Sequence, residues 1–167
     1  RTKKMALRFF CILVFISFQL AAQSPRLLKK ATKLIEKTYA VDDLQLVYKE
    51  FQTKSVIGNF YKIFDSDQLL GFAFIGTAPS KTDTFEYLVV FDQSLIIKKV
   101  NVLVYREDYG GEIGSNRWLK QFVGKARSTE LAVGKNIAAI SGATISVYSM
   151  TNAVNQLLNE MNQLEQI

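Results

Sequence analysis

The chain has 167 residues, of which 49% are hydrophobic and 12% aromatic, so it is long enough and apolar enough for one globular domain. Its net charge is +6, but four of the 21 basic residues lie in the first 22 positions, which contain no acid. The remainder carries 17 basic and 15 acidic residues, a balance that argues against a nucleic-acid-binding protein. Because the chain has no histidine, a Ser-His-Asp triad and an imidazole metal site are excluded, and no metal site is expected.

Residues 1–22 have the order of a secretory signal peptide: basic residues up to Arg8, an apolar run from Phe9 to Leu20, then Ala21-Ala22. The run is shorter than the ~20 residues needed to cross a bilayer. We expect cleavage near Ala22 and export to the periplasm or the outer face of the cytoplasmic membrane, with a retained short membrane anchor as the alternative. Residues 23–167 are predicted to form a single domain, which would contain no cysteine because Cys11 is the only one.

The next segments predict a helix followed by a sheet. Residues 25–40 have the pattern of an amphipathic helix with Pro25 in its first turn, and its basic side chains are expected to form a solvated face. Residues 44–52 suit either a strand or a short helix. Strands are predicted at 59–64, 69–77, 85–91 and 95–105, separated by a turn at 65–68, a loop at 78–83 and a turn at 92–94, which together indicate an antiparallel meander.

The last third of the chain predicts helices that pack on this sheet. Residues 106–114 form a polar connection with glycines, and residues 115–123 predict a helix ended by Gly124. Residues 131–140 are expected to be extended. Apolar residues from Val147 to Leu164 recur at three- and four-residue spacing, which predicts a C-terminal amphipathic helix. The predicted fold class is therefore α+β, an antiparallel sheet with packed helices.

The run from Ser141 to Ser146, Ser-Gly-Ala-Thr-Ile-Ser, opens this last helix. A helix start leaves about four backbone N–H groups unpaired and favours negative charge, and small residues let a phosphate approach the backbone closely. The run therefore suits a phosphate-bearing cofactor such as FMN, which can carry redox chemistry in a chain with few reactive side chains. The alternative is that a Ser or Thr side chain simply caps the helix.

The same run, followed by an apolar helix, resembles the motif of FMN-binding domains, which occur in sodium-translocating NADH:quinone reductases, in Rnf-type complexes and in small secreted proteins. The stretch from Val102 to Ile113 and the helix ending in Phe122-Val123-Gly124-Lys125 are similar to the region after the central sheet of that family. The resemblance covers about residues 69–160.

The resemblance implies that a flavin transferase attaches FMN to Thr144 through a phosphoester. It implies that Ser141 and Ser146 hydrogen-bond the phosphate, that Gly142 and Ala143 permit its close approach, and that Ile145 belongs to the same site. Gly110, Gly111 and Glu112 would line the flavin ring or the ribityl chain. Tyr109 and Trp118 are candidates to stack on the ring, although aromatic residues beside a helix are more often part of the core.

The function implied is electron transfer between redox partner proteins, for which a membrane electron-transfer complex is one candidate, with no catalytic side chain of its own. Two departures from the family are visible: Ala138 stands where an acidic residue is usual, and Tyr109-Gly110-Gly111-Glu112 replaces a Glu-Thr-Pro-Gly turn. Two alternatives stay open: a flavin-dependent reductase that uses the same cofactor, and a domain that has lost FMN, as Ala138 permits, and acts as a binding module.

Overall fold

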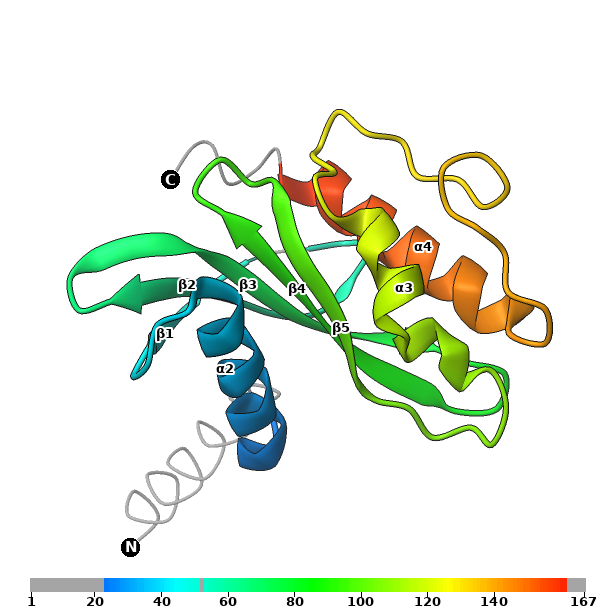
Figure 1. Ribbon diagram of the computed structural model, residues 1–167, viewed down its shortest axis with the longest axis horizontal. Helices are drawn as coiled ribbons and strands as arrows, with labels where there is room; N and C mark the ends of the chain where they lie inside the picture. The colour runs from blue at the N-terminus through cyan, green and yellow to red at the C-terminus, as the bar shows by residue number, and fades with distance from the viewer. Residues whose placement is uncertain (1–22, 52, 162–167) are drawn as a thin grey trace, which may run out of the picture.

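The computed structural model describes residues 23–51 and 53–161, so the predicted signal segment 1–22 lies outside the described residues. The fold is α+β, as predicted: a five-stranded antiparallel sheet with helices packed on both of its faces (Figure 1). In chain order the elements are α2 (Pro25–Tyr39), β1 (Gln45–Lys49), β2 (Ile57–Asp65), β3 (Gln68–Pro79), β4 (Thr84–Asp92), β5 (Ile97–Val104), the short 3-10 helix η1 (Gly111–Gly114), α3 (Asn116–Leu119), η2 (Lys120–Phe122) and α4 (Thr144–Glu160).

The sheet is a meander whose spatial order, β1-β2-β3-β4-β5, follows the chain order. The segment that suited either a strand or a helix is strand β1, which pairs with β2 at one edge. The predicted loop at 78–83 is shorter than expected, because Ala78 pairs with Phe85 and Pro79 with Thr84, so the β3–β4 ladder continues to the last residue of β3. A proline is tolerated there because it ends the strand.

Alternating side chains of β4 divide the core into two clusters. Tyr87, Val89 and Phe91 face the cluster that includes α3, η2 and α4, whereas Leu88 and Val90 face the cluster that includes α2. All five of these side chains are 0% exposed. Strand β4 is therefore covered on both faces, which explains its nearly continuous apolar sequence.

Helix α2 begins at Pro25, as predicted, and closes the second face of the sheet. The hydroxyl of Tyr39, its last residue, donates to the Phe91 carbonyl at 2.8 Å across the space that Gly71 leaves open. Burial, reinforced by the charge of Asp92, raises the pKa of Tyr39 to about 12. This hydrogen bond fixes the end of α2 on the sheet.

The predicted helix at 115–123 is present but divided into α3 and η2. The Ser115 hydroxyl accepts the N–H of Trp118 at 3.3 Å, and Gly124, with φ of 79°, follows its end. The prediction that residues 131–140 are extended is wrong. Gly134 has φ of 85°, and the N–H groups of residues 135–137 all turn back to the Ala132 carbonyl, which leaves a single β-bridge in this stretch.

Helix α4 confirms the predicted C-terminal amphipathic helix, and it packs against the sheet face opposite α2 (Figure 1). Its apolar stripe is buried, with Val147, Met150 and Val154 all 0% exposed. No helix within the described residues is long and apolar enough to span a bilayer.

Candidate cofactor site

The start of α4 lacks the side-chain cap that its sequence suggested. The N-cap residue is Ala143, and no side chain bonds to the first turn. The backbone N–H groups of Thr144, Ile145 and Ser146 have no acceptor among the described residues; the first N–H of the helix to find one is that of Val147, which donates to the Ala143 carbonyl at 2.9 Å. Three donors at the positive end of a 17-residue helix are thus available to an anion.

The turn before the helix leaves room for such an anion. Gly142 has φ of 80°, a conformation that favours glycine, and a Cβ built on it would meet no atom within 4 Å. Ser141, Gly142 and Thr144 are exposed, whereas Ala143 between them is buried. The Thr144 side chain therefore stands at the surface, beside the open turn and the free N–H groups.

The glycine turn after β5 touches this helix start, although the two motifs lie far apart in the sequence. Gly110 has φ of 83°, and a Cβ on it would lie 3.2 Å from the Cβ of Ala143. The structure therefore brings both segments of the family resemblance together. A cavity lies over these two segments; Glu112, on η1, is part of its lining, whereas Gly111 is not.

Tyr105 links the two segments and was missed by the sequence analysis. Its hydroxyl donates to the Tyr109 carbonyl at 3.0 Å and lies 3.0 Å from the Ser146 hydroxyl. Because a carbonyl can only accept, the single Tyr105 proton goes to Tyr109 and the Ser146 hydroxyl then donates to Tyr105. Ser146 is 4% exposed, and in this arrangement it can donate a hydrogen bond to an anion from its backbone N–H but not from its hydroxyl.

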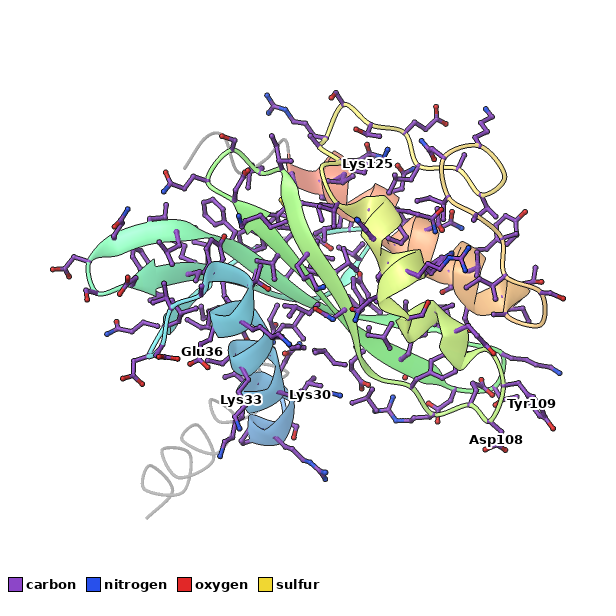
Figure 2. The ribbon with its side chains drawn as sticks, in the orientation of Figure 1. Lys30, Lys33, Glu36, Asp108, Tyr109 and Lys125 are labelled. Carbon is purple, nitrogen blue, oxygen red and sulfur yellow. The ribbon has the colours of Figure 1, made fainter. Side chains whose placement is uncertain are left out.

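A cavity of about 700 Å³ lies over these groups, within the range of small-molecule sites. Every predicted cofactor residue except Gly111 lines it. Tyr109, a stacking candidate, is 84% exposed and projects from the connection after β5 together with Asp108 (Figure 2). The lining residues are Lys81, Thr82, Tyr105, Glu107, Asp108, Tyr109, Gly110, Glu112, Ser141, Gly142, Ala143, Thr144, Ile145 and Ser146.

Trp118, the other stacking candidate, belongs to the core instead. It is 5% exposed, and its ring meets that of Phe122 edge-on with centroids 5.2 Å apart. Its indole N–H donates to the Ala138 carbonyl at 2.8 Å, while the Ala138 N–H donates to Gln121 at 2.7 Å. The position where the family usually has a carboxylate is thus held through its backbone.

The charged residues around the cavity are mostly acidic: Glu107, Asp108 and Glu112 against Lys81. Glu107 accepts hydrogen bonds from the Thr82 N–H at 2.6 Å and from the hydroxyls of Ser80 and Thr82 at 2.7 and 2.9 Å. These bonds lower the pKa of Glu107 from its ordinary value of 4.5 to about 2. Glu107 thereby holds the β3–β4 loop against the glycine turn, and it remains ionised.

The described residues contain no group of three or more carboxylate, cysteine or histidine side chains that could hold a metal ion. The open turn and the unpaired N–H groups at the start of α4 instead suit a phosphate group. Residues 81–159 match the model of the FMN-binding domain family. The cofactor of this domain is FMN, and the resemblance stated from the sequence is confirmed at the level of the family. No curated protein matches the chain.

The residues present fit FMN. The three free N–H groups and the open turn at Gly142 suit its phosphate, and the cavity extends from them to Tyr109.

Proposed function

We propose that the protein is an extracytoplasmic flavoprotein that carries electrons through FMN attached by a phosphoester to Thr144. The observation that carries this proposal is the exposed Thr144 side chain beside three uncapped backbone N–H groups and an open glycine turn. The basic, apolar and small-residue order of residues 1–22 supports export. A flavin transferase and redox partner proteins are the partners that this function requires.

The charges around the site favour a covalent bond over simple binding. A helix dipole contributes only ~0.3–1 kcal/mol to anion binding, or about 2 kcal/mol when partly buried, whereas micromolar retention needs ~8 kcal/mol. Three carboxylates and one lysine line the cavity, so the phosphate dianion of free FMN is repelled. A phosphodiester has one charge fewer and cannot dissociate, which removes both difficulties.

Attachment requires a bond from the Thr144 oxygen to phosphorus. Because water is a poor leaving group, the flavin donor must carry an activated phosphate, such as the phosphoanhydride of a flavin dinucleotide. The threonine loses its proton, the anhydride bond breaks, and the nucleotide leaves, so that the chain gains FMN less one water. The N–H groups of residues 144–146 would hold the phosphate oxygens, and Tyr105 keeps Ser146 in place.

Once bound, FMN supplies one- or two-electron transfer. The chain then needs only to position the flavin, to shield it and to set its electrostatic environment. The acids at Glu107, Asp108 and Glu112 disfavour the addition of negative charge and so lower the reduction potential, while Lys81 opposes them. Because the cofactor supplies the redox chemistry, the chain needs no acid–base side chain, which agrees with its lack of histidine.

The experiment that tests the proposal is the mass of the denatured protein after export from cells with an active flavin transferase. We expect the wild type and Thr144→Ser to gain FMN less one water on the peptide that contains residue 144. We expect Thr144→Val, which keeps the branched shape but lacks the hydroxyl, to gain nothing while its melting temperature stays within a few degrees. Covalent flavin on Thr144→Val, or its absence from the wild type, would overturn the assignment.

A further inference from the structure

A second cavity, of about 810 Å³, lies between the first turns of α2 and the end of β5. Five cations line it against a single carboxylate, that of Glu86. Four of the cations come from α2 and the fifth from the connection after β5, so the cluster joins two segments that are distant in the sequence. Figure 2 shows two of them, Lys30 and Lys33, on α2. The cationic residues are Arg26, Lys29, Lys30, Lys33 and Arg106.

Two of the five cations have partners within the fold. Arg106 pairs with Glu86, with 2.7 Å between Nη2 and Oε1, and thereby neutralises the only carboxylate of the lining. The ammonium group of Lys30 donates to the Leu103 carbonyl and so lies against β5. The cavity wall is thus fixed in place, while its net charge stays strongly positive.

The other three, Arg26, Lys29 and Lys33, are exposed and have no hydrogen bond or ion pair to any described residue. Their spacing of three and four residues places them along one side of α2. Arg26 lies in the first turn, where the helix dipole favours acids and where α2 has none. Repulsion among the three cations and the dipole at Arg26 oppose this arrangement, and a bound anion would offset both costs.

The cavity also has an apolar part, formed by Leu27, Leu103 and Val104. A free phosphate would use the cations but not the apolar residues. A phosphate diester uses both, because its charged oxygens meet the cations while its ester carbons meet the apolar residues, and a phospholipid headgroup is such a diester.

We propose that this cavity binds the headgroup phosphate of anionic phospholipids and holds the α2 face of the domain on a membrane surface. Helix α2 does not bind by insertion, because its apolar residues Ala31 and Ile35 are 0% exposed and packed on the sheet. The attraction to the membrane surface is therefore mainly electrostatic and must weaken as salt shortens the Debye length from about 10 Å at 0.1 M to about 3 Å at 1 M. The proposal does not depend on how the flavin is attached.

The test is flotation of the exported protein with two kinds of vesicle, one of phosphatidylcholine alone and one in which a quarter of the lipid is phosphatidylglycerol. The difference between the two isolates the contribution of the anionic headgroups from any binding that does not depend on their charge. The variant carries Lys29→Gln and Lys33→Gln. The matched control carries Lys120→Gln and Lys135→Gln, which remove the same charge from exposed positions outside the cavity.

We expect binding to depend on phosphatidylglycerol and to fall with salt, and the Lys29/Lys33 variant to lose roughly 30-fold in affinity, from ~1 kcal/mol for each cation. The control should lose much less. Equal binding to both vesicles, or equal losses in variant and control, would overturn the proposal. A third outcome would also overturn it: inorganic phosphate raises the melting temperature of the wild type but not of the variant, and the protein shows no preference for anionic vesicles. The site would then bind free phosphate rather than a lipid headgroup. Unchanged melting temperatures of both variants in phosphate-free buffer show that they fold.

Discussion

The contact between the two halves of the cofactor site can be tested by adding a single methyl group at Gly110. A Cβ there would lie 2.8 Å from the Tyr105 hydroxyl, 3.2 Å from the Ala143 Cβ and 3.3 Å from the Ala143 Cα. The tyrosine cannot move aside freely, because its hydroxyl bonds to Tyr109 and to Ser146. The methyl group therefore pushes the glycine turn away from the start of α4.

The expected cost has two parts. An alanine at a φ of 83° costs ~1–2 kcal/mol, and overpacking a tight contact costs ~1–3 kcal/mol more, so Gly110→Ala should destabilise the fold by roughly 2–5 kcal/mol. Gly124 is the matched control: its φ is 79°, but a Cβ would meet nothing within 4 Å, so Gly124→Ala should cost only the ~1–2 kcal/mol of the backbone.

Urea unfolding followed by circular dichroism measures both variants, and the difference between them is the free energy of the contact. The flavin content of each purified protein shows whether the displaced helix start still accepts the cofactor; we expect a loss in Gly110→Ala only. If Gly110→Ala unfolds at the same urea concentration as Gly124→Ala and carries the same flavin, the packing of Gly110 on Ala143 is unimportant and the reasoning is refuted.

Three further predictions concern the same site. Gly142→Ala should cost the same ~1–2 kcal/mol as Gly124→Ala, since both positions are open, yet flavin content should fall only in Gly142→Ala because its methyl group occupies the space of the phosphate. Tyr105→Phe keeps the ring but removes two hydrogen bonds, and urea unfolding should show a loss of ~1–3 kcal/mol, since the buried Ser146 hydroxyl is left without its partner. The pKa of Glu107 is lowered on folding to about 2, so its stabilising effect is full above about pH 4.5 and is lost as the pH falls to about 2. Thermal melts across that window should show a shallower loss of stability for Glu107→Gln than for the wild type; parallel curves would contradict this role.

Much of the fold could be predicted from the sequence because its signals are local. The turns at 65–68 and 92–94 and the alternating strands around them determine the meander, and Pro25 marks the start of α2. The stretch 131–140 was predicted wrongly because its apolar residues are not part of a ladder: Leu131 and Ile137 are buried individually while the backbone turns between them.

The site itself was only half visible in the sequence. The run from Ser141 to Ser146 identifies the helix start, because small and hydroxyl-bearing residues before an apolar helical pattern indicate a helix N-terminus whatever the rest of the fold. Tyr105 could not be found in this way, since its role depends on a contact with a residue 41 positions away. The cations of α2 were predicted to form a solvated face for the same reason. The other wall of their cavity is formed by β5 and Arg106, which are distant in the sequence.

The order of the strands has a consequence for the stage of folding at which the cofactor site forms. Each strand pairs with the one before it, so the sheet can assemble hairpin by hairpin, whereas α4 begins 40 positions after β5 ends. A 17-residue helix is marginal in isolation and is stabilised by docking, here through Val147 and Met150. We therefore expect the N–H groups that receive the phosphate to be ordered only once α4 has docked on the sheet. On the proposed chemistry, the flavin transferase would then act on folded chains, and every yellow molecule in a preparation would have docked α4.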